Sequence, residues 1–357
     1  MGDFSFYNYL FSMSLTKQNI KSSLIGMRLD DFTSIIKNYN EPKYRAEQIF
    51  NWIYKRNAQS LAEMENLPKQ LKINIADNYV INPLKILKIT GAKSAKTRKF
   101  LLECQDGEKI ETVLMKEQKR ITRCLSSLVG CALGCGFCAT GTMGIIRNLT
   151  VGEIVAQYLL LLKESEKPIT NVVFMGMGEP FLNYANVIEA ANLLNHHKGI
   201  NLGTRHITIS TAGIIPQIQQ FAKENQRYKL AISLNGSTQE QRLKTMPIAK
   251  KYPIVKLLES VKDYYNASRK LVTFEYVLLA DFNDSELDAK RLVNLISDLP
   301  CKLNVIPYNE IGGKFSRPSD EKIREFLGNL LNSPFMVTTR WSKGADINAG
   351  CGQLVVN

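Results

Sequence analysis

The chain has 357 residues, of which 45% are hydrophobic and 22% are charged. This size and composition exclude an intrinsically disordered chain and a small fold held together by disulfides, and they predict about two domains. The 46 basic side chains exceed the 33 acidic ones to give a net charge of +13, which favours a polyanionic partner, most often nucleic acid, although a generally basic proteome would produce the same excess.

The sequence has no membrane or export signal. Its longest aliphatic run, residues 159–162, is far shorter than the roughly 20 residues that cross a bilayer. The N-terminus has no basic stretch followed by an apolar run, so we expect no signal peptide. These features predict a cytoplasmic protein that does not bind a membrane.

Residues 1–85 are predicted to form a small helical accessory domain that binds RNA. One amphipathic helix is expected from Asp30, and a second over residues 44–54, where apolar residues at 46, 49, 50, 53 and 54 follow the helical period. Pro42 suits the first turn of that second helix. The first 100 residues carry a net charge of +8, which is most of the excess in the chain.

Residues 86–120 are predicted to be a basic connecting β segment. No acidic residue stands between Lys85 and Lys99. The basic side chains of this run are Lys85, Lys88, Lys93, Lys96, Arg98 and Lys99. We expect them to contact phosphate groups of RNA, and a merely solvated face is the alternative.

From residue 121 onward, strands alternate with helices. Strands are predicted at 121–125, 171–175, 206–210, 229–234, 271–279, 302–307 and 335–340, with helices at 151–163, 185–197, 214–223, 254–266 and 286–299. Thr150 and Glu153 form a capping box for the first of these helices. The pattern predicts an α/β fold of six parallel βα units over residues 121–334, which suits a partial (βα)6 barrel better than a doubly wound sheet. The active site should lie at the carboxyl ends of the strands.

Seven cysteines, an odd number in a chain expected to be cytosolic, argue against a disulfide framework. Cys131, Cys135 and Cys138 form a Cys-x3-Cys-x2-Cys loop after the first predicted barrel strand. This spacing suits a [4Fe-4S] cluster, whereas zinc would need a fourth ligand nearby. A cluster held by three cysteines leaves one iron open to bind S-adenosylmethionine.

Further motifs surround this loop. They are Cys124-Leu-Ser-Ser-Leu-Val-Gly-Cys131, Met175-Gly-Met-Gly-Glu179-Pro180, Ile207-Thr-Ile-Ser210-Thr-Ala-Gly213, Ser233-Leu234-Asn235 and Asp346-Ile-Asn-Ala-Gly-Cys351-Gly-Gln-Leu354. Together with the cluster loop, residues 41–354 resemble the radical S-adenosylmethionine superfamily, and within it the bacterial methyltransferases that act on carbon 2 of adenosine in 23S ribosomal RNA and transfer RNA. A sister group methylates carbon 8 of the same ribosomal adenosine and confers antibiotic resistance.

The resemblance implies a two-step methyl transfer. Cys351, in a C-terminal segment at 335–357, takes a methyl group from one S-adenosylmethionine. A second S-adenosylmethionine yields a radical that removes hydrogen from this methyl group, and the carbon radical adds to adenine. Cys124 then helps to release the product through a disulfide with Cys351, and Glu111 matches the family's proposed proton acceptor.

The resemblance also implies which residues bind S-adenosylmethionine. These are Gly178, Glu179, Ser210, Ser233, Leu234, Asn235 and Asn309. Two positions depart from the family pattern: Asn235 replaces a usual histidine, and Gly350 replaces a usual alanine and should loosen the loop of Cys351. Cys104 and Cys301 match no motif and are expected to be buried hydrophobic residues.

The resemblance further implies a monomer that receives electrons from a donor such as flavodoxin or ferredoxin. Carbon-8 methylation is the alternative activity, and the segment Pro300-Cys301-Lys302-Leu303-Asn304 weakly favours carbon 2. A non-enzymatic RNA-binding or zinc-binding protein is the third hypothesis. The sequence leaves open whether ribosomal RNA, transfer RNA or both are substrates.

Overall fold

The computed structural model describes residues 21–118, 120–165 and 167–356. Residues 1–20 lie outside the described residues. Two predictions fall on them: that they belong to the helical domain, and that they do not form a signal peptide. Among the described helices, none is long and apolar enough to span a bilayer.

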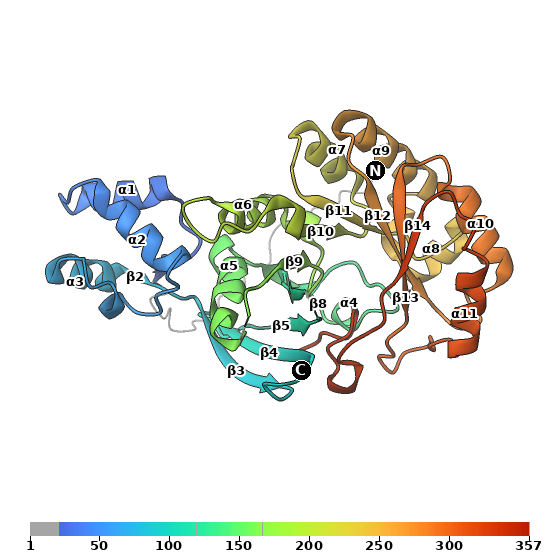
Figure 1. Ribbon diagram of the computed structural model, residues 1–357, viewed down its shortest axis with the longest axis horizontal. Helices are drawn as coiled ribbons and strands as arrows, with labels where there is room; N and C mark the ends of the chain where they lie inside the picture. Colours follow the sequence, from blue (N-terminus) through green and yellow to red (C-terminus); the bar gives the residue numbers. More distant parts are fainter. Residues whose placement is uncertain (1–20, 119, 166, 357) are drawn as a thin grey trace, which may run out of the picture.

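The N-terminal part is helical and lies at one end of the molecule (Figure 1). Its elements are β1 (Ser22–Ser23), α1 (Leu29–Asn38), α2 (Tyr44–Tyr54), α3 (Lys69–Asn78) and β2 (Tyr79–Val80). The apolar face predicted for α2 is buried, because Ala46, Ile49, Phe50 and Ile53 are each less than 2% exposed. α1 packs against this helix, with the rings of Phe32 and Phe50 edge to face at 6.2 Å.

A ten-stranded sheet forms the centre of the molecule, in the order β14-β13-β12-β11-β10-β9-β6-β5-β4-β3. The parallel strands are β6 (Ile121–Cys124), β9 (Asn171–Phe174), β10 (Ile207–Thr211), β11 (Lys229–Ser233), β12 (Val272–Leu278), β13 (Cys301–Pro307) and β14 (Met336–Thr339). Their order never reverses, which makes an open partial barrel rather than a doubly wound sheet. The predicted fold is confirmed.

Helices cover the outside of this barrel (Figure 1). They are α5 (Val151–Leu160), α6 (Tyr184–Asn195), α7 (Ile215–Lys223), α8 (Gln239–Thr245), α9 (Ile254–Ser268), α10 (Glu286–Ile296) and α11 (Asp320–Gly328). The capping box predicted for α5 is present: Glu153 N donates to Thr150 Oγ1, and Thr150 N donates to Glu153 Oε2. The predicted helix over 151–163 is split, because its last turn is a 3-10 turn at Leu161–Glu164.

Short elements that the sequence did not predict connect these units. They are the helices α8 and α11, the four-residue α4 (Ala139–Thr142), and the hairpin of β7 (Leu128–Cys131) with β8 (Gly144–Asn148). Further 3-10 turns lie at Leu61–Glu63, Pro180–Asn183, Thr204–His206, Pro247–Lys250 and Ala345–Ile347. The hairpin was missed because its two strands pair across the whole cysteine loop, with Cys131 opposite Gly144.

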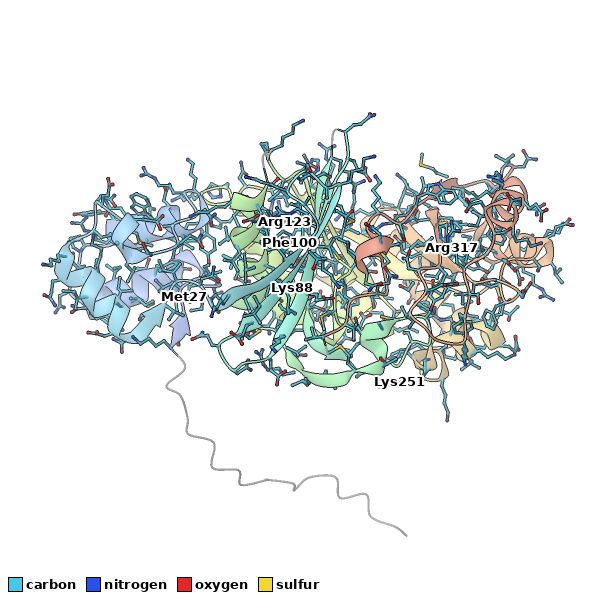
Figure 2. The ribbon with its side chains drawn as sticks, turned by 90° about the horizontal axis from the view of Figure 1, so that it is seen from below. Met27, Lys88, Phe100, Arg123, Lys251 and Arg317 are labelled. Carbon is cyan, nitrogen blue, oxygen red and sulfur yellow. The ribbon has the colours of Figure 1, made fainter. Side chains whose placement is uncertain are left out.

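Three antiparallel strands extend the barrel sheet towards the N-terminal helices. These are β3 (Leu84–Thr90), β4 (Thr97–Cys104) and β5 (Lys109–Lys116), and β5 pairs with β6 so that Val113 lies opposite Cys124. Phe100 on β4, labelled in Figure 2, is fully buried. The β segment and the barrel therefore share one continuous sheet.

Two glycines bring the N-terminal domain into backbone contact with the barrel. A Cβ on Gly26 would lie 2.5 Å from the nitrogen of Gly152 at the start of α5, and a Cβ on Gly152 would overlap the carbonyl oxygen of Ile25. Gly26 also has φ +104°, a conformation that other residues rarely adopt. The close approach at this contact therefore depends on both glycines.

We predict that Gly152→Ala destabilises the protein by about 1–3 kcal/mol, because the new methyl group has no space. Alanine would normally strengthen a helix by about 1 kcal/mol relative to glycine. Gly328→Ala is the matched control, since a Cβ there meets nothing within 4 Å. Urea unfolding of both variants checks this, and equal or greater stability of Gly152→Ala would contradict the contact.

Candidate active site

A pocket opens at the carboxyl ends of the barrel strands, where parallel α/β folds place their sites. It is lined by three groups of residues: the cysteine loop, the ends of β9 to β13, and the C-terminal loop. The lining residues that the sequence singled out are Cys131, Cys135, Cys138, Gly178, Glu179, Ser210, Ser233, Asn235, Asn309 and Cys351. Residues from 131 to 351 thus meet in one place.

The three loop cysteines form one wall of this pocket. Burial raises the pKa of Cys131 to about 11 and also raises those of Cys135 and Cys138. Among the described residues, no three His, Cys, Asp or Glu side chains converge on a point where one metal ion would be held. Three thiols on one wall of a pocket match the ligand set of a [4Fe-4S] cluster, in which each would bind a different iron atom.

The cysteine loop and the C-terminal loop are joined by hydrogen bonds. Ala139 N donates to the carbonyl of Gly352 at 2.7 Å, and Thr140 Oγ1 donates to the carbonyl of Leu354 at 2.5 Å. Cys351 immediately precedes the first of these acceptors. The two loops therefore hold Cys351 at the cysteine wall of the pocket.

The sequence analysis expected Gly350 to loosen this loop, but the structure shows close packing around it. It is buried, and a Cβ there would lie 2.7 Å from the side chain of Asn309. Its N–H donates to Gln353 Oε1 at 3.0 Å, and Asn309 Nδ2 donates to the carbonyl of Cys351 at 3.0 Å. Glycine at this position permits close packing of the loop, so the expectation of a loose loop was wrong.

A second hollow adjoins the first and contains Cys124. The two hollows share Met175, Ile306, Arg340, Cys351 and Leu354. Burial, together with the negative charge of a thiolate at Cys351, raises the pKa of Cys124 to about 12. Cys351 thus borders both the pocket of the cysteine wall and the hollow of Cys124.

Arg340 is a site residue that the sequence analysis missed. Its guanidinium borders both hollows, and negative charge on Cys351, Glu275 or Cys124 raises its pKa, with Cys351 as the largest cause. The guanidinium contacts methionine sulfur, with Nη1 at 3.3 Å from Met175 Sδ. The available signal was a basic residue at the carboxyl end of the last predicted strand.

Glu179 is aimed into the pocket from the turn after β9. Its carboxylate accepts hydrogen bonds from Ala212 N at 2.7 Å and Phe181 N at 3.0 Å. Burial nevertheless raises its pKa to about 7. Gly178 has φ +94° and a Cβ there would lie 2.5 Å from Leu128, so this turn requires glycine. A buried carboxylate in this position suits an ammonium group of a ligand.

The remaining predicted ligand residues fall into two groups. Ser210 and Ser233 line the pocket at the ends of β10 and β11. Leu234, by contrast, is fully buried in the core and does not line the pocket. Asn235 lines it, but its Oδ1 accepts from Val277 N at 2.9 Å and its backbone has φ +51°. Asparagine tolerates this left-handed conformation better than most residues.

Glu111 lies beside these hollows but lines neither of them. It is buried, with Oε1 at 2.8 Å from Lys99 Nζ, and its Oε2 accepts from Val355 N at 3.1 Å. It shares a face of β5 with Val113, the residue opposite Cys124. Its proposed role as proton acceptor stays a prediction.

Two residues of the basic segment are not free to contact phosphate. Arg98 is buried and pairs with Glu164 at 2.9 Å, while Lys99 is engaged by Glu111. The expectation that both contact RNA was wrong, because Arg98 is buried against the partly exposed Glu164 and Lys99 reaches the buried Glu111 on the neighbouring strand β5. Lys85, Lys88, Lys93 and Lys96 are exposed, as phosphate contact requires.

Comparison with known proteins identifies both parts of the chain. Residues 125–293 match the radical SAM superfamily, and residues 22–81 match the ribosomal RNA large subunit methyltransferase N-terminal domain. The chain is 46% identical over 337 residues to the probable dual-specificity RNA methyltransferase RlmN of Dictyoglomus thermophilum, covering 93% of this chain and 96% of that protein.

Two further relatives agree. The dual-specificity RNA methyltransferase RlmN of Geobacter sulfurreducens is 43% identical over 330 residues, covering 92% of this chain and 91% of that protein. The crystal structure of a radical SAM methyltransferase from Sphaerobacter thermophilus superposes with a TM-score of 0.90 at 40% identity, covering 93% of this chain and 99% of that chain.

The raised pKa of Glu179 predicts a pH-dependent stability for the protein without bound ligands. Its folded pKa, about 7, lies above the ordinary value of 4.5, so folding favours the protonated carboxyl group. This contribution is complete below about pH 4.5 and is lost as the pH rises through 7. Wild type should therefore lose stability relative to Glu179→Gln over this range. Urea unfolding at several pH values measures this, and parallel curves would contradict the burial of the charge.

Proposed function

The chain belongs to the RlmN family of radical S-adenosylmethionine RNA methyltransferases, and from that premise we propose how its own residues divide the methylation of adenosine carbon 2 in 23S ribosomal RNA and transfer RNA. The position of Cys351 carries the proposal. This thiol borders both the pocket of the three cluster cysteines and the hollow of Cys124. One side chain can therefore face the methyl donor on one side and the RNA base on the other.

Cys131, Cys135 and Cys138 would hold the [4Fe-4S] cluster, and Glu179 would accept hydrogen bonds from the amino group of S-adenosylmethionine. When bound, the cluster and S-adenosylmethionine supply the methyl group and a 5′-deoxyadenosyl radical. Carbon 2 of adenine is electrophilic and has an unreactive C–H bond, so an ordinary polar transfer of CH3+ does not reach it. The pocket walls are largely apolar, which limits contact of this chemistry with water.

Cys351 accepts the methyl group as a thiolate, because the thiolate is the nucleophilic form of cysteine. Arg340 lies where it favours that charge, since it borders Cys351 in both hollows. Cys124, which lines the second hollow together with Cys351, is placed to act on the covalent adduct between Cys351 and the RNA. Release of product then leaves a disulfide between the two thiols, which a reductant must reopen.

The alternative activities are less well supported. The relatives reported above bear the RlmN name, which does not favour carbon-8 methylation. A non-enzymatic role would leave unexplained why thiols from residues 124 and 351 border one hollow. We further propose that the enzyme acts as a monomer in the cytoplasm, where its RNA substrates are, with a one-electron donor such as flavodoxin or ferredoxin.

We predict that Cys124→Ala traps RNA on the enzyme, because the thiol that resolves the adduct is missing. Cys351→Ala should abolish methylation and trap nothing, because no carrier remains. Denaturing gels of reconstituted protein with a 23S fragment, followed by mass spectrometry of the nucleosides, separate these results. Cys301→Ala, at a buried cysteine outside both hollows, is the control. Turnover by Cys351→Ala would overturn the two-step route.

We propose that the exposed basic edge formed by Lys85, Lys88, Lys93 and Lys96 docks RNA together with the N-terminal helices. Figure 2 shows Lys88 on the strands between those helices and the barrel. Phosphate contacts orient RNA without reading its bases. The domain limits at 1–85, 86–120, 121–334 and 335–357, and the RNA-binding role of the first, stay predictions.

Replacing Lys88, Lys93 and Lys96 together by Gln should weaken RNA binding and flatten its salt dependence by up to about 0.7 in slope for each lost phosphate contact. Filter binding of a 23S fragment at several salt concentrations measures both. The matched control replaces Lys256, Lys290 and Lys322, which pair with acids on outer helices. Equal effects of the two triple variants would rule out a specific basic edge.

A further inference from the structure

Arg242 is a buried cation without an acidic partner. It lies in α8 with 0% exposure, and no carboxylate in the described part of the chain lies within 4.0 Å of its guanidinium. Burial lowers its pKa only to about 10, so it stays charged at neutral pH. A buried charge without a counter-ion is costly, and such groups are retained where something compensates them.

Part of the compensation comes from three carbonyl oxygens at the ends of two strands. Arg242 Nη1 donates to the carbonyls of Ser233 at 2.6 Å and Leu234 at 2.8 Å, and Nη2 donates to the carbonyl of Ala212 at 2.6 Å. Arg242 therefore joins the end of β11 to the turn after β10. These are the strand ends that present Ser233 and Ser210 to the pocket.

The backbone of Ala212, to which Arg242 donates, also binds Glu179. Ala212 donates its N–H to the Glu179 carboxylate at 2.7 Å and offers its carbonyl to Arg242. Arg242 and Glu179 are thus both hydrogen-bonded to the backbone of Ala212, through two successive peptide groups. The guanidinium stays outside the pocket lining, whereas the carboxylate lines the pocket.

The cysteine loop lies directly against this arrangement. Cys131, Leu133, Ala212 and Met246 form one small buried cluster, with Cys135 packed on it. Gly136 N donates to the carbonyl of Thr245, at the end of α8, at 2.9 Å. The charges of Arg242 and a thiolate at Cys135 attract each other. Arg242 Nε, moreover, is buried and has no hydrogen-bond partner.

We infer that Arg242 is a positioning residue that fixes the strand ends of the S-adenosylmethionine site and places a permanent positive charge behind the cluster, which makes the cluster easier to reduce. This inference rests on the proposed function, because the counter-charge is the cluster with its three thiolates. Reduction adds one electron from an external one-electron donor and increases the negative charge of the cluster by one. A fixed cation nearby favours that state, since net charge around a cluster helps to set its potential.

The test separates charge from hydrogen bonding. Arg242→Lys keeps the charge but loses the planar fork, so it should weaken S-adenosylmethionine binding several-fold and leave the midpoint potential of the cluster unchanged. Arg242→Met and Arg242→Gln lose the charge, and both should shift the potential to lower values. Potentials are measured by EPR-monitored titration of anaerobically reconstituted protein, and binding by equilibrium dialysis, so neither readout needs RNA or turnover.

Arg123→Met is the matched control. Arg123 is also fully buried and donates to two carbonyls, those of Gln157 and Tyr158, but it lies on β6 facing α5. It should lower stability without moving the potential. If the neutral Arg242 variants do not fold, Arg242→Lys alone decides. This variant keeps the charge, so a shift in the midpoint potential of its cluster, alongside the weaker binding of S-adenosylmethionine, would contradict the role of the charge.

An unchanged potential in a folded neutral variant would overturn the inference and leave the proposed function standing. A wild-type protein that takes up no iron–sulfur cluster would instead overturn the proposed function, and this inference with it.

Discussion

The contact between the cysteine loop and the C-terminal loop is the interaction on which the site depends. Two hydrogen bonds, from Ala139 and Thr140 to the carbonyls of Gly352 and Leu354, join segments more than 200 residues apart. They place Cys351 at the wall of cluster cysteines and, at the same time, at the hollow of Cys124. Without this contact, nothing would hold Cys351 against the three cysteines of the loop and the hollow of Cys124.

The continuous sheet gives this contact a rigid base. The antiparallel strands β5, β4 and β3 continue the barrel sheet beyond β6, and β5 carries both Glu111 and the residue opposite Cys124. The N-terminal domain then meets α5 through the backbones of Gly26 and Gly152. A surface that docks RNA on β3 and a site at the strand ends would therefore keep a constant separation, as transfer to one chosen adenosine requires.

Two buried charged groups at and beside the pocket are held by backbone. Glu179 accepts from two N–H groups, and Arg242 donates to three carbonyls. Neither charge has an opposite charge within ion-pair distance in the described ranges. Backbone groups hold these side chains in place while their charge remains available to a ligand that brings its own, such as an ammonium group or an anionic cluster.

The sequence by itself determined the barrel, the cluster loop and the reactive cysteines. Alternating strands and helices follow local hydrophobic periodicity, and cysteine spacing within eight residues needs no tertiary information. Tertiary structure alone decided three other points. Arg98 and Lys99 pair with Glu164 and Glu111 from other elements, and Gly350 is tightly packed because Asn309 comes from another strand end. Arg242 and Arg340 become visible as site residues only when distant segments meet, because a basic residue on a helix or at a strand end usually faces solvent.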